Sequence, residues 1–118
     1  THSTSSAASD VYKRQPIATY ANDYITHKII LDGWFEKREL YAVEKFFSSM
    51  QLDKKICIDA GANIGNHSLF FSRIFERVFS FEPNKEVFKL LEINASSVSN
   101  ISVIEASGID PSINSSKC

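Results

Sequence analysis

The segment with the clearest chemical potential is a glycine-containing loop in the middle of the chain. Residues 59–65 read DAGANIG and lie between a short apolar run, 56–60, and a helical pattern. In open α/β sheets, ligands bind at the carboxyl ends of the strands, so this loop is where we expect a cofactor. Gly61 permits a sharp turn with positive φ, and Gly65 lets the following helix approach the sheet or the ligand closely.

The glycine spacing bears on which cofactor the loop can hold. A dinucleotide-binding loop has the pattern G-x-G-x-x-G, in which the second glycine lets the backbone approach the pyrophosphate. Counted from Gly61, the second and third glycine positions are occupied by Asn63 and Asn66. A side chain therefore stands where the pyrophosphate would pass. The loop disfavours NAD and FAD and favours a nucleoside ligand without phosphates, of which S-adenosylmethionine is the common example.

A second set of candidate residues follows at the ends of two further predicted strands. Glu82 lies about 20 residues beyond Gly61, where dinucleotide folds place the acid that binds the ribose. Carboxylate oxygens only accept hydrogen bonds, which suits a ribose diol that donates twice. Pro83 stiffens the turn after Glu82. Glu105 and Ala106 end the third strand, where we expect the adenine edge.

Residues around the loop are candidates for binding the amino-acid part of such a cofactor. Asp59 is predicted to interact with the ammonium group, directly or through water. The helix predicted to begin near Asn66 favours negative charge at its N-terminus, and His67 and Ser68 in its first turn offer donors. No metal site is predicted, because no histidine has partners at ligand spacing. The complete predicted cofactor-binding set is Asp59, Gly61, Ala62, Asn63, Gly65, Asn66, His67, Ser68, Glu82, Pro83, Glu105 and Ala106.

The elements that must position these residues alternate between strand and helix. A strand is predicted over 26–31, before an Asp-Gly turn, and an amphipathic helix over 34–50. Strands over 56–60, 77–81 and 101–105 are separated by two helices, the first running to about Glu76 and the second capped by Asn84. This order predicts a parallel sheet with right-handed crossovers and flanking helices, an incomplete Rossmann-like α/β fold.

Three segments together resemble the FkbM-type S-adenosylmethionine-dependent methyltransferases: IDAGANIGNHSLFFS, VFSFEPNKEVFKLLEINA and NISVIEA, in that order and spacing. The resemblance runs from about Cys57 to Ala106, and more weakly back to Trp34. It implies a class I methyltransferase fold with about three parallel strands in the order 3-2-1. It also implies methyl transfer to a hydroxyl oxygen of a polyketide, sugar or related small-molecule acceptor.

The two ends of the chain depart from this pattern. Residues 5–15, SSAASDVYKRQ, resemble the translation of an adapter used in transposase-based sequencing libraries. We therefore expect residues 1–15 to be a non-native, disordered tail, followed by a strand and an amphipathic helix within 16–53. Residues 54–118 are expected to be the cofactor-binding half-domain, truncated at its C-terminus, because nothing after Ile109 resembles the family's acidic fourth strand. No catalytic residue is assigned for the same reason.

Composition excludes several other classes of protein. The 118 residues are 43% hydrophobic with a formal net charge of −1, which suits one soluble globular unit without a basic stripe for nucleic acid. The apolar runs are far shorter than the roughly 20 residues of a membrane span. Two cysteines are too few for a disulfide scaffold, so a cytoplasmic location is expected. The expected partner is a small-molecule acceptor, and the sequence assigns no oligomeric state.

Two alternatives stay open from the sequence alone. The loop could belong to an NAD(P)-dependent oxidoreductase, which would bind NAD more tightly than S-adenosylhomocysteine. The chain could also be a folded fragment without activity that binds neither ligand. In the methyltransferase fold that the resemblance implies, a fourth strand would cover the strand over 55–60. Here this strand is expected to form an open, apolar sheet edge, which predicts marginal stability or aggregation.

Overall fold

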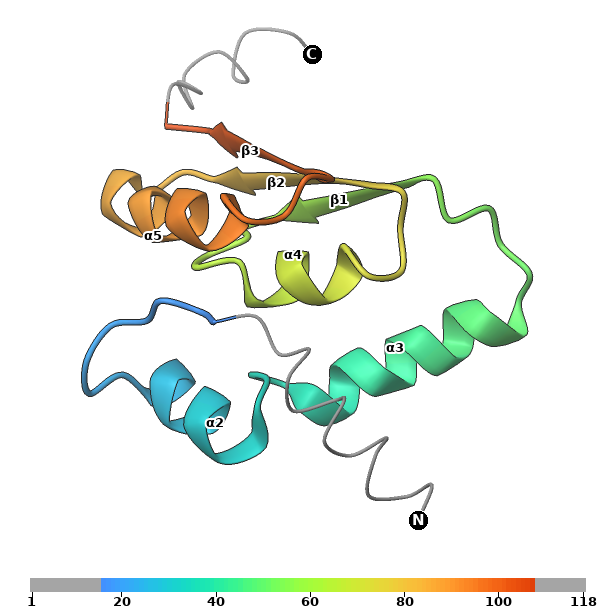
Figure 1. Cartoon of the computed structure of the whole chain (residues 1–118), viewed down its shortest axis with the longest axis horizontal. Helices are drawn as coiled ribbons and strands as arrows, with labels where there is room; N and C mark the ends of the chain where they lie inside the picture. The colour runs from blue at the N-terminus through green and yellow to red at the C-terminus, as the bar shows by residue number, and fades with distance from the viewer. Residues whose placement is uncertain (1–15, 108–118) are drawn as a thin grey trace, which may run out of the picture.

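Three parallel strands organise the part of the chain that the computed structural model describes, residues 16–107. Strands β1 (Ile56–Ala60), β2 (Arg77–Glu82) and β3 (Ile101–Glu105) form one sheet in the order β1-β2-β3. Both pairings are parallel, which confirms the predicted α/β fold and strand order (Figure 1). The predicted adapter-derived tail, 1–15, and the predicted truncated end, 108–118, lie outside the described residues.

Helices α4 (Asn66–Phe71) and α5 (Lys85–Ala95) connect the strands and lie on the same side of the sheet (Figure 1). Beneath them, strand β2 buries alternate side chains, those of Val78, Ser80 and Glu82. This alternation follows from the two-residue period of a strand. The covered face therefore holds the core of the described residues and also its buried polar groups.

Helix α3 (Lys37–Ser49) lies beyond α4, so the described residues form layers on one side of the sheet (Figure 1). Phe70 of α4 is at the centre of this packing, with Trp34 and Tyr41 edge-on against its ring at centroid distances of 5.5 and 5.4 Å. Leu40 is the buried residue of α3. The predicted amphipathic helix is thus present, shorter than predicted at its N-terminal end.

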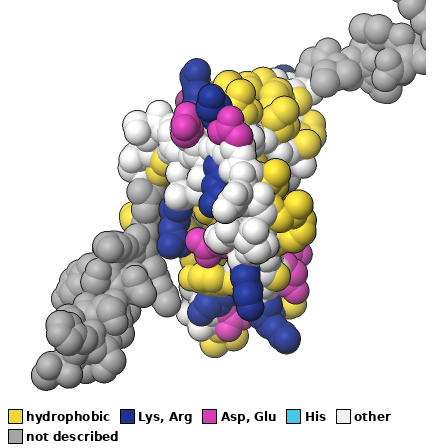
Figure 2. Space-filling view, turned by 90° about the vertical axis from the view of Figure 1, so that its right-hand side faces the viewer, with side chains coloured by type: hydrophobic (Ala, Val, Ile, Leu, Met, Phe, Trp, Pro, Cys, Tyr) yellow, Lys and Arg dark blue, Asp and Glu magenta, His cyan; other side chains and the backbone are white. Residues whose placement is uncertain are grey.

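No described element covers the opposite face of the sheet. There Ile56 and Ile58 are 60% and 68% exposed, and Phe79, the register partner of Ile58, is half-buried. Phe81 and its register partner Ile104 lie on the same face and are also half-buried. Strand β1 is also an edge strand of the described sheet. In Figure 2, hydrophobic side chains gather along one side of the molecule, apart from the charged side chains above and below.

The predicted strand over 26–31 is wrong, because these residues belong to helix α2 (Tyr24–Asp32). The β-branched residues suggested a strand, yet Ile25 and Ile29 are four residues apart and share the half-buried face of a helix. Gly33, expected in a two-residue turn, instead ends the helix with φ +87°, and its N–H donates to the Ile29 oxygen at 2.8 Å. A left-handed glycine is a common helix terminator.

Helix α4 ends earlier than its sequence pattern indicates, at Phe71 instead of about Glu76. Asn100, at the start of β3, explains the difference, since its Nδ2 donates to the carbonyl oxygens of Ser72 and Phe75 at 2.8 and 3.0 Å. These carbonyls are therefore satisfied without a continued helix. The predicted cap of α5 is confirmed, because Asn84 Oδ1 accepts from the N–H groups of Glu86 and Val87. Within residues 16–107, no helix is both long and apolar enough to cross a bilayer.

Candidate functional site

The loop that follows β1 is held in an unusual backbone conformation by the end of β2. Gly61, Asn63 and Gly65 all have positive φ, at +79°, +53° and +94°. The N–H groups of Gly61 and Ala62 both donate to the carbonyl oxygen of Phe81 at 2.9 Å. The loop is therefore fixed over the carboxyl ends of β1 and β2, where the sequence placed it.

The two loop glycines serve different purposes. A Cβ atom at Gly61 would meet nothing within 4 Å, so this glycine is required only for its positive φ. A Cβ atom at Gly65 would lie 2.9 Å from Leu91 Cδ1, so this glycine also allows close packing. The close approach expected at Gly65 is thus made with α5.

Glu82 is the acid that joins the two loops of the site. The residue is 7% exposed. Its Oε2 accepts from the Asn63 N–H and its Oε1 from the Asn84 N–H, each at 2.8 Å. Two backbone donors thus compensate the burial of its charge. A carboxylate oxygen can accept more than one hydrogen bond, so each oxygen retains capacity for a ligand donor.

The end of β3 lies directly beside Glu82. Glu105 is the register partner of Glu82, and the Ala106 N–H donates to the Glu82 carbonyl oxygen at 3.1 Å. Pro83 occupies the turn between Glu82 and the cap residue Asn84. The structure therefore brings the predicted residues of all three strand ends to one edge of the sheet.

Asp59, at the end of β1, takes part in a chain of hydrogen bonds beneath α4. Its Oδ2 accepts from the Ser68 hydroxyl at 2.6 Å, and the Ser68 oxygen accepts from the Ser80 hydroxyl at 2.7 Å. Both serines are 0% exposed. The sequence placed Asp59 and Ser68 among the site residues but missed Ser80, because its role depends on the register between β1 and β2.

Two other predicted residues hold the segment between α2 and α3 against the site. Asn66 accepts from the Phe35 N–H at 3.1 Å and donates to the Phe35 oxygen at 2.8 Å. His67 Nε2 lies 3.0 Å from Glu36 Oε2. The Asn66 side chain is 6% exposed and fully engaged by this backbone contact. Among the twelve predicted residues, Asn66 and His67 therefore face the N-terminal segment.

Asn94 of α5 is a structural partner of the loop that the sequence did not reveal. Its Nδ2 donates to the oxygens of Ile64 and Ala18 at 2.7 and 2.9 Å, and its Oδ1 accepts from the Ala18 N–H at 2.6 Å. It is a buried polar residue. One amide therefore joins the helix, the loop and the first described residues, which no local pattern indicates.

Cys57 is the neighbour of Asp59 on the covered face of β1, two residues earlier. Burial raises the pKa of the Cys57 thiol, and the negative charge of Asp59 raises it further. Both causes disfavour the thiolate, which is the nucleophilic form. Cys57 is thus a poor nucleophile candidate in this site.

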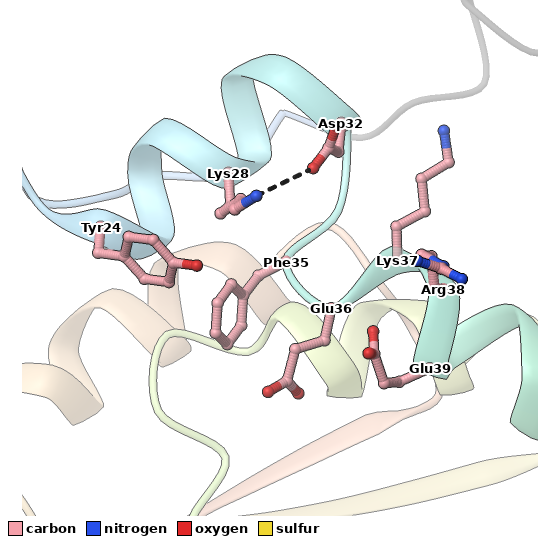
Figure 3. A pocket seen from close by; sticks show the side chains of 8 residues that line it. All are labelled: Tyr24, Lys28, Asp32, Phe35, Glu36, Lys37, Arg38 and Glu39. Atoms are coloured by element: carbon pink, nitrogen blue, oxygen red, sulfur yellow. Dashed lines mark ion pairs between the residues drawn. The ribbon is translucent and has the colours of Figure 1, made fainter.

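A cavity of about 320 Å³ lies apart from the loop, between α2 and the start of α3 (Figure 3). Its walls carry charges of both signs, and the Lys28 ammonium group is 4.0 Å from the Asp32 carboxylate. None of the predicted cofactor-binding residues lines it, although Glu36 in its wall is the partner of His67. The lining residues are Tyr24, Lys28, Asp32, Phe35, Glu36, Lys37, Arg38 and Glu39.

Comparison with known proteins gives fold-level likenesses. No protein-family model matches the chain. No curated protein matches it either. Among solved structures, an S-adenosylmethionine-dependent methyltransferase from Clostridium acetobutylicum matches with a TM-score of 0.54 and 14% identity. That match covers 74% of this chain and 37% of the other.

Two further solved structures are similar over shorter stretches. One is a candidate RNA methyltransferase, PH1948, from Pyrococcus horikoshii, with a TM-score of 0.47, 23% identity, and coverage of 57% of this chain and 33% of that one. The other is the YcgJ protein of Bacillus subtilis, with a TM-score of 0.46, 18% identity, and coverage of 55% and 29%. The chain thus spans about a third of the length of the solved structures it matches. The described residues have the Rossmann-like fold of the Clostridium methyltransferase.

Proposed function

We propose that residues 54–107 bind S-adenosylmethionine across the carboxyl ends of β1, β2 and β3. The observation that carries the proposal is the Glu82 carboxylate, which accepts one backbone N–H from each of the two loops flanking the site. An acid fixed in this way is oriented before a ligand arrives, and its remaining acceptor capacity suits a diol. Glu82 would therefore hold the two ribose hydroxyls.

The charges around the loop suit the rest of this cofactor. Asp59 and Glu105 stand at the ends of the strands on either side of Glu82. S-adenosylmethionine carries a sulfonium and an ammonium group, and carboxylates stabilise such cations. Asp59 would bind the ammonium group, and the end of β3 at Glu105 and Ala106 would lie beside the adenine.

The same geometry disfavours a dinucleotide. In a pyrophosphate-binding loop, backbone N–H groups are free to donate to the phosphates. Here the N–H of Asn63 donates to Glu82 instead, and the N–H groups of Gly61 and Ala62 donate to Phe81. A pyrophosphate would meet a buried carboxylate where it needs donors. This observation argues against the oxidoreductase alternative.

We extend the proposal to the parent activity, O-methylation of a hydroxyl on a small-molecule or sugar-type acceptor. The support is the FkbM-type resemblance of three segments whose order and spacing fit the observed loop, β2 and β3. When bound, S-adenosylmethionine supplies an electrophilic methyl group, and the residues described above would bind and orient it. A cytoplasmic location and a small-molecule partner belong to the same proposal.

Isothermal titration of the chain with S-adenosylhomocysteine and with NAD tests the proposal. We expect saturable binding of S-adenosylhomocysteine and weaker or no binding of NAD. Glu82→Gln removes the charge that strengthens these hydrogen bonds, so its affinity should fall by about tenfold or more. Glu92→Gln, at an exposed position of α5, is the matched control and should bind like the wild type.

Two outcomes would contradict the proposal. Tighter binding of NAD than of S-adenosylhomocysteine would favour an oxidoreductase. Absence of binding by a sample with a cooperative unfolding transition would favour a folded fragment without activity. The unfolding midpoint of Glu82→Gln must be measured beside its affinity, because Glu82 also holds the two loops.

A further inference from the structure

We propose that Ser68 and Ser80 are positioning residues that hold Asp59 in the orientation required to bind the ammonium group of S-adenosylmethionine. This inference rests on the function proposed above. It assigns to two buried serines a part in ligand binding that they perform without touching the ligand.

Three elements meet at this hydrogen-bond chain. Asp59 of β1 and Ser80 of β2 are register partners in the parallel sheet, and their side chains lie on the covered face. Ser68 comes from the first turn of α4, which packs above both strands. The Ser68 hydroxyl therefore bridges neighbouring strands from above, and the position of α4 fixes that of the Asp59 carboxylate.

The direction in which these hydroxyl groups donate follows from the number of hydrogens available. An ionised carboxylate only accepts, so the single hydroxyl hydrogen of Ser68 is directed to Asp59 Oδ2, at 2.6 Å. The Ser68 oxygen is then an acceptor, and Ser80 fills that role as donor at 2.7 Å. Donation by Ser80 polarises the Ser68 O–H bond and strengthens its bond to Asp59.

Burial separates the roles of the three residues. Ser68 and Ser80 are 0% exposed, so neither can contact a ligand in this arrangement. Asp59 is partly exposed at the carboxyl end of its strand, and within residues 16–107 its second oxygen, Oδ1, accepts no hydrogen bond. One carboxylate oxygen of Asp59 is thus held by Ser68, while the other is left for a cation.

The affinities of Ser80 variants for two ligands distinguish a positioning role of Ser80 from a purely structural one. S-adenosylhomocysteine carries the amino-acid group, whereas 5′-methylthioadenosine has the same nucleoside and thioether without it. Ser80→Ala removes the hydroxyl that donates to Ser68, and Ser80→Thr keeps a hydroxyl at this position. Ser102→Ala, on the uncovered face of β3, is the matched control. Affinities for both ligands are measured by isothermal titration, with the unfolding midpoint of each variant.

Ser80→Ala should weaken S-adenosylhomocysteine binding by about five- to tenfold, the effect of one hydrogen bond, and leave 5′-methylthioadenosine within about twofold. Ser80→Thr and Ser102→Ala should bind both ligands like the wild type. In an Asp59→Asn background, Ser80→Ala should add no further loss for S-adenosylhomocysteine, because the group it orients is gone. If Ser80→Ala does not fold, Ser68→Ala is measured with the same ligands and the same expectation.

Equal loss of both ligands in Ser80→Ala, or loss of neither, would overturn the positioning role and leave the proposed function intact. An undiminished effect of Ser80→Ala in the Asp59→Asn background would also overturn it. Failure of the folded wild-type chain to bind either ligand would instead overturn the proposed function, and this inference with it.

Discussion

The two faces of the three-stranded sheet differ in almost every property that the structure describes. The face beneath α4 and α5 holds Asp59, Ser80 and Glu82, each of which makes at least one hydrogen bond. The opposite face presents apolar side chains such as Ile58, with 68% of its surface exposed. The covered face thus combines core residues such as Val78 with buried polar side chains, whereas the open face carries several exposed apolar ones.

This contrast separates the residues of the candidate site from the apolar residues of the open face. The polar side chains of the covered face lie toward the carboxyl ends of the strands, where the helices shield them and set their hydrogen bonds. No described helix or strand covers the apolar side chains of the open face, which resemble an interior surface. A contiguous exposed apolar patch of this kind is typical of an interaction surface.

The largest expected difference between the faces is in stability. Leu91→Ala, on the buried side of α5, should lower the free energy of unfolding by about 2–5 kcal/mol, because loss of this fully buried side chain leaves a cavity. Ile58→Ala removes as many carbon atoms from the open face and should cost less than about 1 kcal/mol. Urea denaturation of both variants measures the contrast. Similar losses would show that Ile58 is covered in solution.

The two loop glycines, Gly61 and Gly65, should differ in how much their replacement by alanine destabilises the covered side of the sheet. Gly65→Ala should cost about 2–4 kcal/mol, since it combines left-handed strain with a clash against Leu91. Gly61→Ala has the same kind of strain without the clash and should cost about 1–2 kcal/mol. The difference between their urea midpoints isolates the packing contribution. A larger loss at Gly61 would contradict this assignment.

We expect the apolar open face of the sheet to cause self-association of the chain. Ile58→Lys places a charge on β1, an edge strand of the described sheet, and charged residues on edge strands oppose pairing with other chains. We expect the wild-type chain to associate at micromolar to millimolar concentration and the variant to be more nearly monomeric, with stability changed by at most about 0.5 kcal/mol. Sedimentation velocity measures the association state of both proteins. A wild-type chain that stays monomeric over this concentration range would contradict the expectation.

The smallest effect concerns the Cys57 thiol. Removing the negative charge of Asp59 in Asp59→Asn should lower the pKa of Cys57, although burial, the larger cause, remains. Because the thiolate is the reactive form, alkylation by iodoacetamide should become faster at a given pH. Asp53→Asn, at an exposed position before β1, is the control. An unchanged pH profile in Asp59→Asn would show that Asp59 is screened from the thiol.

The sequence was sufficient for the features that depend on local pattern. The apolar runs of β1, β2 and β3, the Asn84 cap and the glycine loop follow from neighbouring residues, and each is found where predicted. Helix α2 was mistaken for a strand, since β-branched residues occur in both and Gly33 can end either. Local preference is weaker than packing in such cases.

The internal contacts of the site could not be predicted in the same way. Ser80 reaches Asp59 only through the strand register and Ser68, and Asn94 meets Ala18 across most of the described chain. Such contacts depend on how distant segments pack. The side chains of Asn66 and His67, expected at the cofactor, bind the segment before α3 for the same reason.

The strand order β1-β2-β3 has a consequence for how this unit is assembled during synthesis. β2 and β3 each pair with the strand that precedes them in the chain, so each described sheet contact closes a single helical crossover. Pairing between strands that are neighbours in sequence costs less loop-closure entropy than pairing between distant ones, and it allows sequential assembly. β1 would act as the first template, to which β2 and then β3 are added as they emerge. Within residues 16–107, no further strand joins the other edge of β1.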